Sequence, residues 1–420
     1  IFVLAENNVE FVTSYIGFLV KGLVPVLINP KIEIDLLRNL VRNYLPSYIF
    51  LPSSKKISFE NYEKFIDLKK HKIFKIKKKI NYSINKDLAL MLTTSGSTGS
   101  KKFVRLSHQN INDNTKNIVK YLKIEENQKT ITTMPPYYTY GLSIINTHLY
   151  AGASIFITNM SVVEKKFWKN FEEQKITSFG GVPYFYEIIK KLSFNKMHFP
   201  NLKYFTQAGG PLNRELTKYF MNYAEKNNVD FIIMYGQIEA TSRMTYLPYK
   251  ILKKKIGSIG KPIPGGKIRL QSEKSDNDKK GEIIYEGKNV SLGYSTNYKD
   301  LKKGDENKGI LKTGDLAKKD KNGYLFIIGR KSRNIKLFGH RVNLDEIETI
   351  LQKKGHNCLC LGQDNKITIF SRKKRNVTEI IQFLSKLMNV HSTCFNFKYI
   401  KTFPLSSNNK ISYKKLDKFI

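Results

Sequence analysis

The sequence predicts an α/β protein with a large N-terminal domain and a small α+β C-terminal domain. Apolar stretches typical of strands alternate with stretches of helical periodicity up to residue 236. This alternation is typical of parallel-rich sheets with flanking helices. From Ile256 the pattern changes to short strands separated by turns, which indicates a β-rich subdomain within the large domain. At 420 residues the chain is too long for one small hydrophobic core, so two domains are expected.

The first part of the chain reads as strand, helix, strand, helix and strand. The strands are expected at residues 1–5, 23–28 and 48–52, and the helices at Val9–Leu19 and Glu33–Asn43. A basic stretch, Lys69–Lys79, then leads to a buried strand at Leu88–Leu92, and a helix is expected at Leu106–Leu122.

A second alternating block follows. Its strands are expected within 130–134, 154–158, 178–182, 203–210 and 231–236, and its helices at 142–150, 162–174, 184–192 and 212–226. The polar stretch 272–281 reads as a hairpin loop within the β-rich subdomain. A hinge is expected just after Arg330, which divides the chain into domains 1–330 and 331–420. The second domain reads as helix Leu344–Lys353, strands 358–362 and 367–371, helix Thr378–Met388 and strand Phe395–Ile400.

One short segment points to chemistry. Residues 94–99, TSGSTG, contain two glycines and four hydroxyl side chains, with Lys101 and Lys102 directly behind them. Glycines let the backbone approach a phosphate closely, and successive N–H groups can form an anion-binding nest. A flexible Ser/Gly linker is the alternative, but the position between an expected strand and an expected helix favours a phosphate loop.

Four further motifs follow in order: MYGQIEA (234–240), KTGDL (312–316), GRKSRNIKLFGHRVNLDEIE (329–348) and PLSSNNKISYKKL (404–416). Together with TSGSTG they resemble the signature motifs of the adenylate-forming superfamily, which includes acyl-CoA ligases and adenylation domains. The resemblance covers nearly the whole chain. It implies that a carboxylate attacks the α-phosphate of ATP to give acyl-AMP, and that a thiol then displaces AMP.

The same resemblance implies cofactors and residue roles. ATP and Mg²⁺ are expected, with CoA as the acceptor or, alternatively, the phosphopantetheine of a separate carrier protein. Lys410, Thr98 and Glu239 are the candidate catalytic residues, with Glu239 as the magnesium ligand. The candidate ATP- and AMP-binding residues are Thr94, Ser95, Gly96, Ser97, Thr98, Gly99, Lys102, Ala208, Gly209, Gly210, Tyr235, Gly236, Gln237, Asp315 and Arg330.

Three other sites follow from the resemblance. The acyl pocket is assigned to Tyr138, Phe179, Gly180, Val182 and Gly236. Gly339 and Arg341 are assigned to a thiol tunnel, and Ser332 to the pivot about which the small domain is expected to move.

The chain also departs from the superfamily pattern. Ile238 stands where a threonine is usual, and Asn409 where a glycine precedes the lysine. Two alternatives therefore stay open: a stand-alone adenylation enzyme that loads a separate carrier protein, and a degenerate, non-catalytic acyl- or nucleotide-binding protein. The chain begins at Ile1, and a further strand and helix are expected before it.

Composition narrows the possible partners. The net charge is +37, from 72 basic and 35 acidic residues, but the lysines are spread along the whole chain without a nucleic-acid motif. We therefore expect no specific nucleic acid partner. Three cysteines without metal-ligand spacing, no transmembrane segment and no recognisable signal peptide favour the cytoplasm. A place in fatty acid metabolism is a further expectation.

Overall fold

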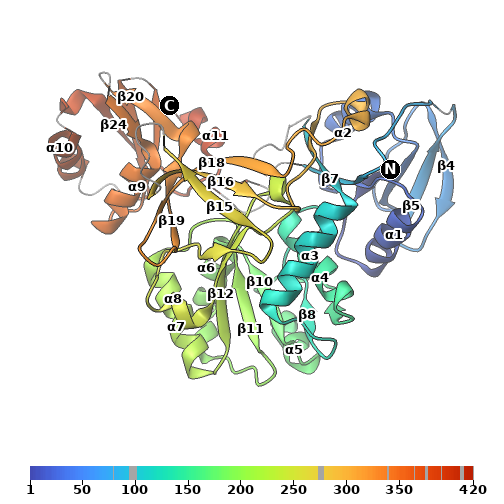
Figure 1. Ribbon diagram of the computed structural model, residues 1–420, viewed down its shortest axis with the longest axis horizontal. Helices are drawn as coiled ribbons and strands as arrows, with labels where there is room; N and C mark the ends of the chain where they lie inside the picture. The colour runs from blue at the N-terminus through green and yellow to red at the C-terminus, as the bar shows by residue number, and fades with distance from the viewer. Residues whose placement is uncertain are drawn as a thin grey trace. The chain divides into compact units, whose positions relative to one another are not determined.

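The computed structural model describes residues 1–78, 80–93, 102–272, 279–337, 340–363, 365–373, 377–388, 390–406 and 411–419, without the side chains of Asn334, Lys336, His340 and Arg341. The chain forms two compact units: unit 1 comprises residues 1–268 and 285–311, and unit 2 comprises residues 269–284 and 312–420. Figure 1 labels their helices and strands.

The first sheet of unit 1 has eight strands in the order β17-β7-β6-β2-β1-β3-β5-β4. Their bounds are β1 (Phe2–Leu4), β2 (Val26–Ile28), β3 (Tyr48–Pro52), β4 (Tyr62–Asp67), β5 (His71–Ile76), β6 (Leu88–Thr93), β7 (Phe103–Ser107) and β17 (Gly293–Ser295). Strands β1, β2, β3 and β6 pair in parallel, whereas β4, β5, β7 and β17 join antiparallel. Helix α1 (Val9–Val20) packs in a cluster on one face and α2 (Ile34–Tyr44) in the cluster on the other.

In this region the structure adds a strand that the sequence did not predict and corrects one expectation. The basic stretch 69–79 contains a strand, β5, which forms a hairpin with β4. The helix expected at Leu106–Leu122 begins only at His108, because residues 103–107 form the buried strand β7. Ser107 then caps α3 (His108–Leu122): its side chain accepts from the Asn110 N–H while the Asn110 side chain accepts from the Ser107 N–H.

The second sheet of unit 1 has seven strands in the order β14-β13-β12-β11-β10-β8-β9. Their bounds are β8 (Lys129–Ile131), β9 (Ser154–Phe156), β10 (Ser178–Gly181), β11 (Tyr204–Gln207), β12 (Asp230–Tyr235), β13 (Thr245–Leu247) and β14 (Lys261–Pro262). Strands β8 to β12 are parallel, as the alternating pattern predicts. The helices are α4 (Thr139–Tyr150), α5 (Lys165–Glu173), α6 (Pro183–Lys191), α7 (Arg214–Lys226) and α8 (Tyr249–Leu252).

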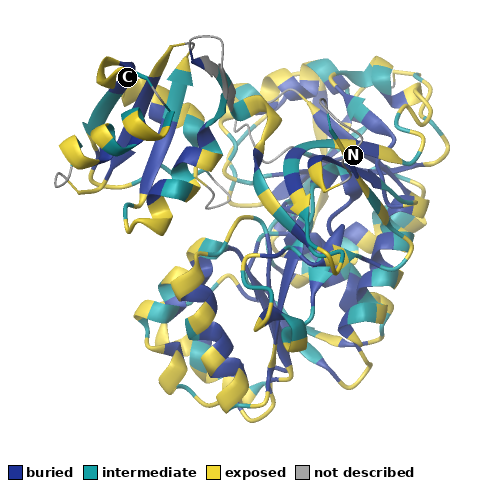
Figure 2. Ribbon diagram, turned by 60° about the vertical axis from the view of Figure 1, so that its left-hand side comes forward, coloured by how far each residue is buried: buried dark blue, intermediate teal, exposed yellow. Residues whose placement is uncertain are grey.

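The two faces of this second sheet differ. On one face, aromatic side chains of α5, α6 and α7 pack against those of β10, β11 and β12; this layer comprises Phe167, Phe171, Phe179, Tyr186, Phe194, Phe199, Phe205, Phe220, Tyr223 and Phe231. On the other face lies α4, which also contributes Leu142 and Ile145 to a core cluster of the first sheet. Figure 2 shows the strands as mostly buried and the outward faces of the helices as exposed.

Unit 2 contains three small sheets. The first has the order β15-β16-β18-β19, from β15 (Lys267–Gln271), β16 (Lys280–Glu286), β18 (Ile310–Lys319) and β19 (Leu325–Arg330). The others are the hairpin β20 (Asn334–Leu337)–β21 (His340–Asn343) and the sheet of β22 (Cys358–Gln363), β23 (Lys366–Ser371) and β24 (Phe395–Tyr399). Helices α9 (Leu344–Lys353) and α10 (Val377–Met388) pack on the last sheet, and α11 (Tyr413–Leu416) follows.

The compact units divide the chain at Leu311, nearer the N-terminus than the expected hinge after Arg330. Strands β18 and β19, which precede the hinge, cluster with the residues that follow it. The functional division into domains 1–330 and 331–420 stays a prediction. In the described ranges no helix is long and apolar enough to cross a lipid bilayer.

Candidate active site

Two segments assigned to ATP and AMP binding meet the acyl-pocket strand β10 at one edge of the second sheet. The segments Gly180–Val182, Ala208–Gly210 and Tyr235–Gln237 lie at the carboxyl ends of the neighbouring parallel strands β10, β11 and β12. The Ala208 N–H donates to the Gly181 carbonyl at 3.2 Å, and the Gln207 side-chain amide donates to the Gly210 carbonyl at 2.8 Å. Open α/β sheets bind ligands at this edge, because the turns that follow the strands gather there.

At two positions in these turns the backbone geometry requires glycine. Gly209 has φ +87°, a conformation that favours glycine. At Gly236 a Cβ atom would lie 1.7 Å from the Ser242 carbonyl oxygen, so only glycine fits. Both turns therefore depend on glycine for their shape, and the YG pair brings Tyr235 and Gln237 close to the chain that returns at Ser242.

The candidate acyl-pocket residues divide between the two faces of the sheet. Phe179 is buried in the aromatic layer, stacked on Phe205 with ring centroids 5.3 Å apart. Gly180 faces α4, because a Cβ there would lie 2.8 Å from the Tyr140 hydroxyl. Consecutive strand residues point to opposite faces, so Phe179 and Gly180 do not line the same space.

Two other members of that set lie outside the strands. Tyr138 is the N-cap residue of α4, and burial raises the pKa of its hydroxyl. Val182 caps α6 and is also buried.

Glu239 lies in the short 3-10 helix η2 (Ile238–Ala240), directly after the YG turn. Its carboxylate accepts a hydrogen bond from the Tyr294 hydroxyl, with an O···O distance of 2.9 Å. The Lys102 ammonium lies over the Tyr294 ring, 3.3 Å from its centroid, and a cation–π contact at this distance is favourable. Tyr294 thus joins Glu239 to the lysine that follows the phosphate loop.

The backbone around Glu239 is held by a distant segment. The Ser291 N–H donates to the Glu239 carbonyl at 2.8 Å, and the Asn289 side-chain amide donates to the Ala240 carbonyl at 2.9 Å. The Thr241 hydroxyl in turn donates to the Asn289 carbonyl at 2.7 Å. Residues 289–291 therefore fix the position of η2.

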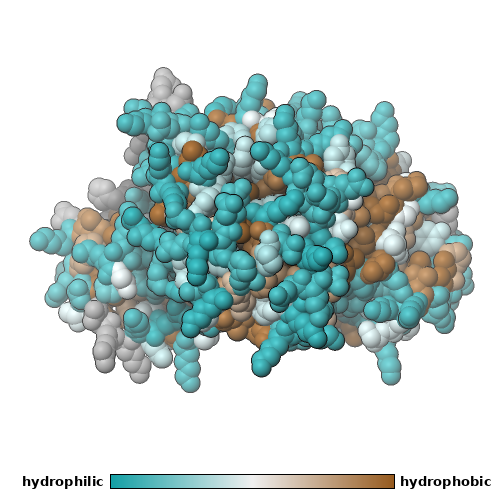
Figure 3. Space-filling model, turned by 90° about the horizontal axis from the view of Figure 1, so that it is seen from below, coloured by the Kyte–Doolittle hydropathy of each residue, from teal (hydrophilic) through white to brown (hydrophobic). Residues whose placement is uncertain are grey.

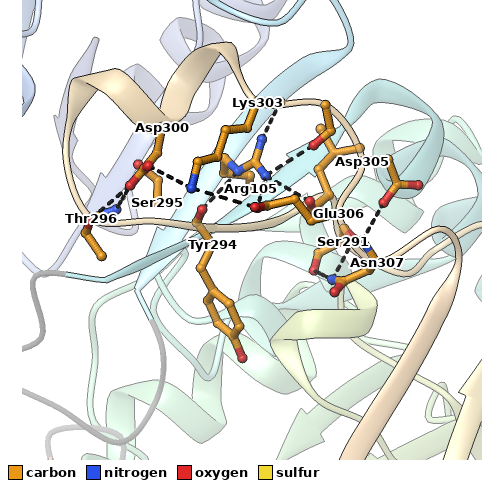
Figure 4. Close-up of polar contacts among 12 residues, drawn as sticks. Arg105, Ser291, Tyr294, Ser295, Thr296, Asp300, Lys303, Asp305, Glu306 and Asn307 are labelled. Carbon is orange, nitrogen blue, oxygen red and sulfur yellow. Dashed lines mark hydrogen bonds and ion pairs between the residues drawn. The ribbon is translucent and has the colours of Figure 1, made fainter.

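Arg105 on β7 anchors the continuation of that segment (Figure 4). Its buried guanidinium donates to the carbonyls of Leu292, Tyr294, Lys303 and Gly304, and pairs with the Glu306 carboxylate at 2.6 Å. Five acceptors around one cation satisfy all of its donor groups. Sequence reasoning missed Tyr294 and Arg105, because their partners lie between 55 and 201 residues away in the chain.

The single carboxylate of Glu239 fits a magnesium ion that is also bound by the phosphates of a nucleotide. Mg²⁺ prefers oxygen ligands and is held by one or two carboxylates, with phosphate oxygens and water completing its octahedron. Within the described ranges no three acidic, histidine or cysteine side chains gather as a metal site. The single carboxylate of Glu239 therefore suits a metal that a phosphate chain brings with it.

Ile238 does not lie open to a phosphate. Its side chain is 8% exposed and packs in the core cluster that includes Leu142 and Ile145 of α4 and Leu92 of β6. A threonine at this position would place its hydroxyl against apolar neighbours.

The two residues expected at the ribose are paired within unit 2. Asp315 on β18 lies opposite Arg330 on β19, and the Arg330 Nε–Asp315 Oδ1 distance is 2.9 Å. Asp315 is buried whereas the Arg330 side chain is 61% exposed. The carboxylate thus sits on a rigid strand with its orientation set by the guanidinium.

The candidate pivot lies in the next turn. Ser332 is exposed in the 3-10 helix η4 (Lys331–Arg333). The Arg330 N–H donates to Asp345 at 2.8 Å, and the Asn343 amide donates to the Arg330 carbonyl at 2.8 Å. A rotation at Ser332 would have to exchange these contacts.

Several sequence-predicted residues lie outside the described part of the chain. These are Thr94, Ser95, Gly96, Ser97, Thr98, Gly99, Gly339, Asn409 and Lys410, together with the side chain of Arg341. Their roles stay predictions. Lys102, at the end of the phosphate loop, is described and exposed.

Comparison with known proteins identifies the family. Residues 1–295 match the family model described as AMP-binding enzyme. Among the relatives, a 2-succinylbenzoate–CoA ligase from Oceanobacillus iheyensis is 26% identical over 83% of this chain and 72% of its own length. An oxalate–CoA ligase from Arabidopsis thaliana is 29% identical over 63% of this chain. The aligned part corresponds to 52% of that relative, so the chain spans about half of its length.

The fold has a close structural counterpart. The o-succinylbenzoate coenzyme A synthetase from Bacillus subtilis, solved in complex with ATP and magnesium, aligns with a TM-score of 0.77 over 99% of this chain and 88% of its own, at 19% identity. This likeness confirms the α/β fold predicted from the sequence. The family match confirms the resemblance inferred from the motifs, and the chain belongs to the family of AMP-binding enzymes.

Proposed function

We propose that this protein is an acid–thiol ligase that activates a carboxylic acid with ATP and transfers the acyl group to CoA. In the first half-reaction a carboxylate oxygen attacks the α-phosphorus, the bond to the β-phosphate breaks, and acyl-AMP and pyrophosphate form. In the second, the thiol sulfur attacks the acyl carbon and AMP leaves. The convergence of Ala208–Gly210 and Tyr235–Glu239 at one sheet edge carries this proposal.

The residues of unit 1 would bind the nucleotide and the metal. The Ala208–Gly210 turn and the Tyr235 ring offer a backbone surface and a flat face to adenine. Glu239 would hold Mg²⁺, which neutralises the phosphate oxygens and so lowers the cost of bringing two anions together. Lys102 and the loop 94–99 would contact the phosphates.

The remaining roles belong to unit 2. Asp315, oriented by Arg330, would accept a hydrogen bond from each of the two ribose hydroxyls, because a carboxylate has two acceptor oxygens. Lys410 would shield the charge that develops between carboxylate and α-phosphate. Gly339 and Arg341 would guide the thiol after the C-terminal domain has rotated about Ser332.

CoA is the proposed acceptor because the relatives are named as CoA ligases. A separate acyl carrier protein is the second candidate acceptor. Neither relative's name specifies a fatty acid, so they lend no support to the expected place in fatty acid metabolism. A cytoplasmic location stays a prediction.

ATP–pyrophosphate exchange over a panel of fatty, aromatic and dicarboxylic acids tests the proposal. We expect exchange that requires Mg²⁺ and one class of acid, and a loss of about 10²–10³-fold in Glu239→Gln, because the charge-stabilising metal loses its ligand. Glu172→Gln, at an exposed position on α5, is the matched control. Nucleotide binding without exchange for any acid would indicate the degenerate binding protein instead.

A further inference from the structure

Arg243 is a buried cation that has no counterion in the part of the chain that the structure describes. It lies between η2 and β13 and is 2% exposed. Its Nε and Nη1 atoms have no hydrogen-bond partner, and among the described residues no carboxylate forms a salt bridge with it. An unpaired buried charge is strongly destabilising. Arg105, with its five acceptors, shows how this same unit satisfies a guanidinium that has a structural role.

The groups around Arg243 are neutral at pH 7. The guanidinium lies over the Tyr140 ring, 4.7 Å from its centroid. Burial raises the pKa of Tyr140 and of Tyr204 to about 12, and it lowers the pKa of His148 to about 4. Burial likewise raises the pKa of Tyr121, although the Arg243 charge and a side-chain hydrogen bond with Arg243 oppose that shift. The aromatic rings can stack with a cation, but none of these groups neutralises it.

Arg243 adjoins the residues assigned to the acyl pocket. A Cβ at Gly236 would lie 2.8 Å from the Arg243 Cα. Tyr140, on which the guanidinium stacks, places its hydroxyl 2.8 Å from where a Cβ at Gly180 would be. The cation therefore lies at the face of the sheet that carries α4, next to the strand ends where the acid would be activated.

We propose that Arg243 binds a second carboxylate on the acid, so that the substrates of this protein are dicarboxylic acids. The inference rests on the proposed function, because it names the substrate class of that same site. Nε and Nη1 supply three N–H donors, and charge-assisted hydrogen bonds from a guanidinium to a carboxylate are among the strongest in proteins. An acid with an apolar end would leave the buried cation unpaired, and such a mismatch produces the largest discrimination that binding sites achieve.

The thermal unfolding midpoint separates this role from a purely structural one. If the guanidinium stabilises the fold, then Arg243→Met, which keeps the length and removes the charge, should lower the thermal unfolding midpoint. If the guanidinium instead binds a substrate carboxylate, Arg243→Met should leave the midpoint of the ligand-free protein unchanged or raise it, because an unpaired buried charge is removed. Arg243→Lys keeps the charge but loses the planar arrangement of donors.

The test compares dicarboxylic acids with monocarboxylic acids of the same length in which a methyl group replaces the second carboxylate. For the parent protein we expect kcat/KM in pyrophosphate exchange to favour the dicarboxylic acids by about 10²-fold or more. Arg243→Met should lower the ratio of kcat/KM for dicarboxylic over monocarboxylic acids by about 10²-fold or more. Arg243→Lys should fall between.

A binding measurement completes the design. With ATP and Mg²⁺ present, a dicarboxylic acid should raise the unfolding midpoint of the parent protein and not that of Arg243→Met. A parent preference for monocarboxylic acids, equal losses for both classes, or failure of Arg243→Met to fold would each overturn the inference. Absence of exchange with every acid would contradict the proposed function instead, and the binding comparison would still decide the role of Arg243.

Discussion

At the scale of the residue, Tyr294 sets the environment of the candidate metal ligand. Its hydroxyl donates to one oxygen of Glu239, and its ring face lies under the Lys102 ammonium. Burial raises the pKa of Tyr294, and the Glu239 charge beside it raises it further, so the hydroxyl keeps its proton at pH 7. It can therefore only donate to the carboxylate, so the second oxygen would be the one that binds the proposed metal.

Tyr294→Phe keeps the ring and removes the donor. One hydrogen bond to a charged group contributes roughly 1.5–3 kcal/mol, so we expect the Mg²⁺ concentration for half-maximal exchange to rise by about 10- to 100-fold. Mn²⁺ binding in the presence of ATP, followed by electron paramagnetic resonance, should weaken in parallel. Tyr150→Phe, at a position 51% exposed, is the control. An unchanged metal requirement would show that Glu239 needs no orienting donor.

His148 predicts a pH dependence of stability. Its Nδ1 lies 2.9 Å from the Ile144 carbonyl, and burial lowers its pKa from 6.5 to about 4. The unfolded chain thus binds the proton more tightly than the folded chain. The contribution of neutral His148 to the free energy of unfolding is therefore complete above pH 6.5 and is lost as the pH falls toward 4. At pH 5 the loss is about 2 kcal/mol.

Thermal unfolding at pH 7.5 and pH 5 measures this effect. His148→Gln, which cannot become charged, should show a smaller decrease in midpoint between the two pH values than the parent. His108→Gln, at an exposed position, should decrease as the parent does. The same pH response in His148→Gln and in the parent would assign the acid sensitivity to other groups.

At the scale of the element, the sequence pattern predicts the parallel strands well and the added antiparallel ones poorly. Strands β10, β11 and β12 are short apolar runs between amphipathic helices, so both their type and their parallel order follow from the alternation. The β4–β5 hairpin carries lysines on exposed positions, which conceal its periodicity. The expected helix includes the last two residues of β7, Leu106 and Ser107, because the strand runs directly into α3.

The candidate site shows the same limit. The turns Ala208–Gly210 and Tyr235–Gln237 are local motifs, and their convergence follows from the order of parallel strands. Tyr294, Arg105 and Arg243 could not be found in this way. Each of them contacts segments that are distant in the chain, and the residues beside it in the sequence give no signal of such a contact.

The link between β7 and β17 depends on Arg105. Arg105→Met would leave Lys303 as the cation beside the Glu306 carboxylate and would remove one donor from each of four carbonyls. We expect a loss of about 1–3 kcal/mol in unfolding free energy, because carbonyl oxygens lose a charged donor, and faster proteolysis within residues 291–307. Arg214→Met, on an exposed position of α7, should change neither. A stable Arg105→Met protein with the parent cleavage rate would contradict the anchoring role.

At the scale of the whole molecule, the chain has two compact units and a large positive charge. On the face shown in Figure 3, hydrophilic residues predominate and hydrophobic areas are interspersed among them. The net charge of +37 comes from lysines spread along the sequence, so we expect only weak, salt-sensitive attraction to polyanions. Such a charge also favours the approach of ATP and CoA, which are themselves polyanions.

The expected rotation of the C-terminal domain is tested at Ser332. Proline restricts φ to about −65°, so Ser332→Pro should resist a change of backbone conformation in η4. Adenylation should survive while thioester formation falls, because only the second step needs the rotated arrangement. Ser332→Ala should behave as the parent protein. Parent rates for both half-reactions in Ser332→Pro would place the pivot elsewhere.

The central claim is that an acyl-adenylate links the two half-reactions. An acid labelled with ¹⁸O in its carboxylate, incubated with the protein, ATP, Mg²⁺ and CoA, tests it by mass spectrometry of the nucleotide product. The attacking oxygen stays on phosphorus when the thiol displaces AMP, so each AMP formed should carry one ¹⁸O atom. Unlabelled AMP, or label found in inorganic phosphate with ADP as the nucleotide product, would contradict the mechanism.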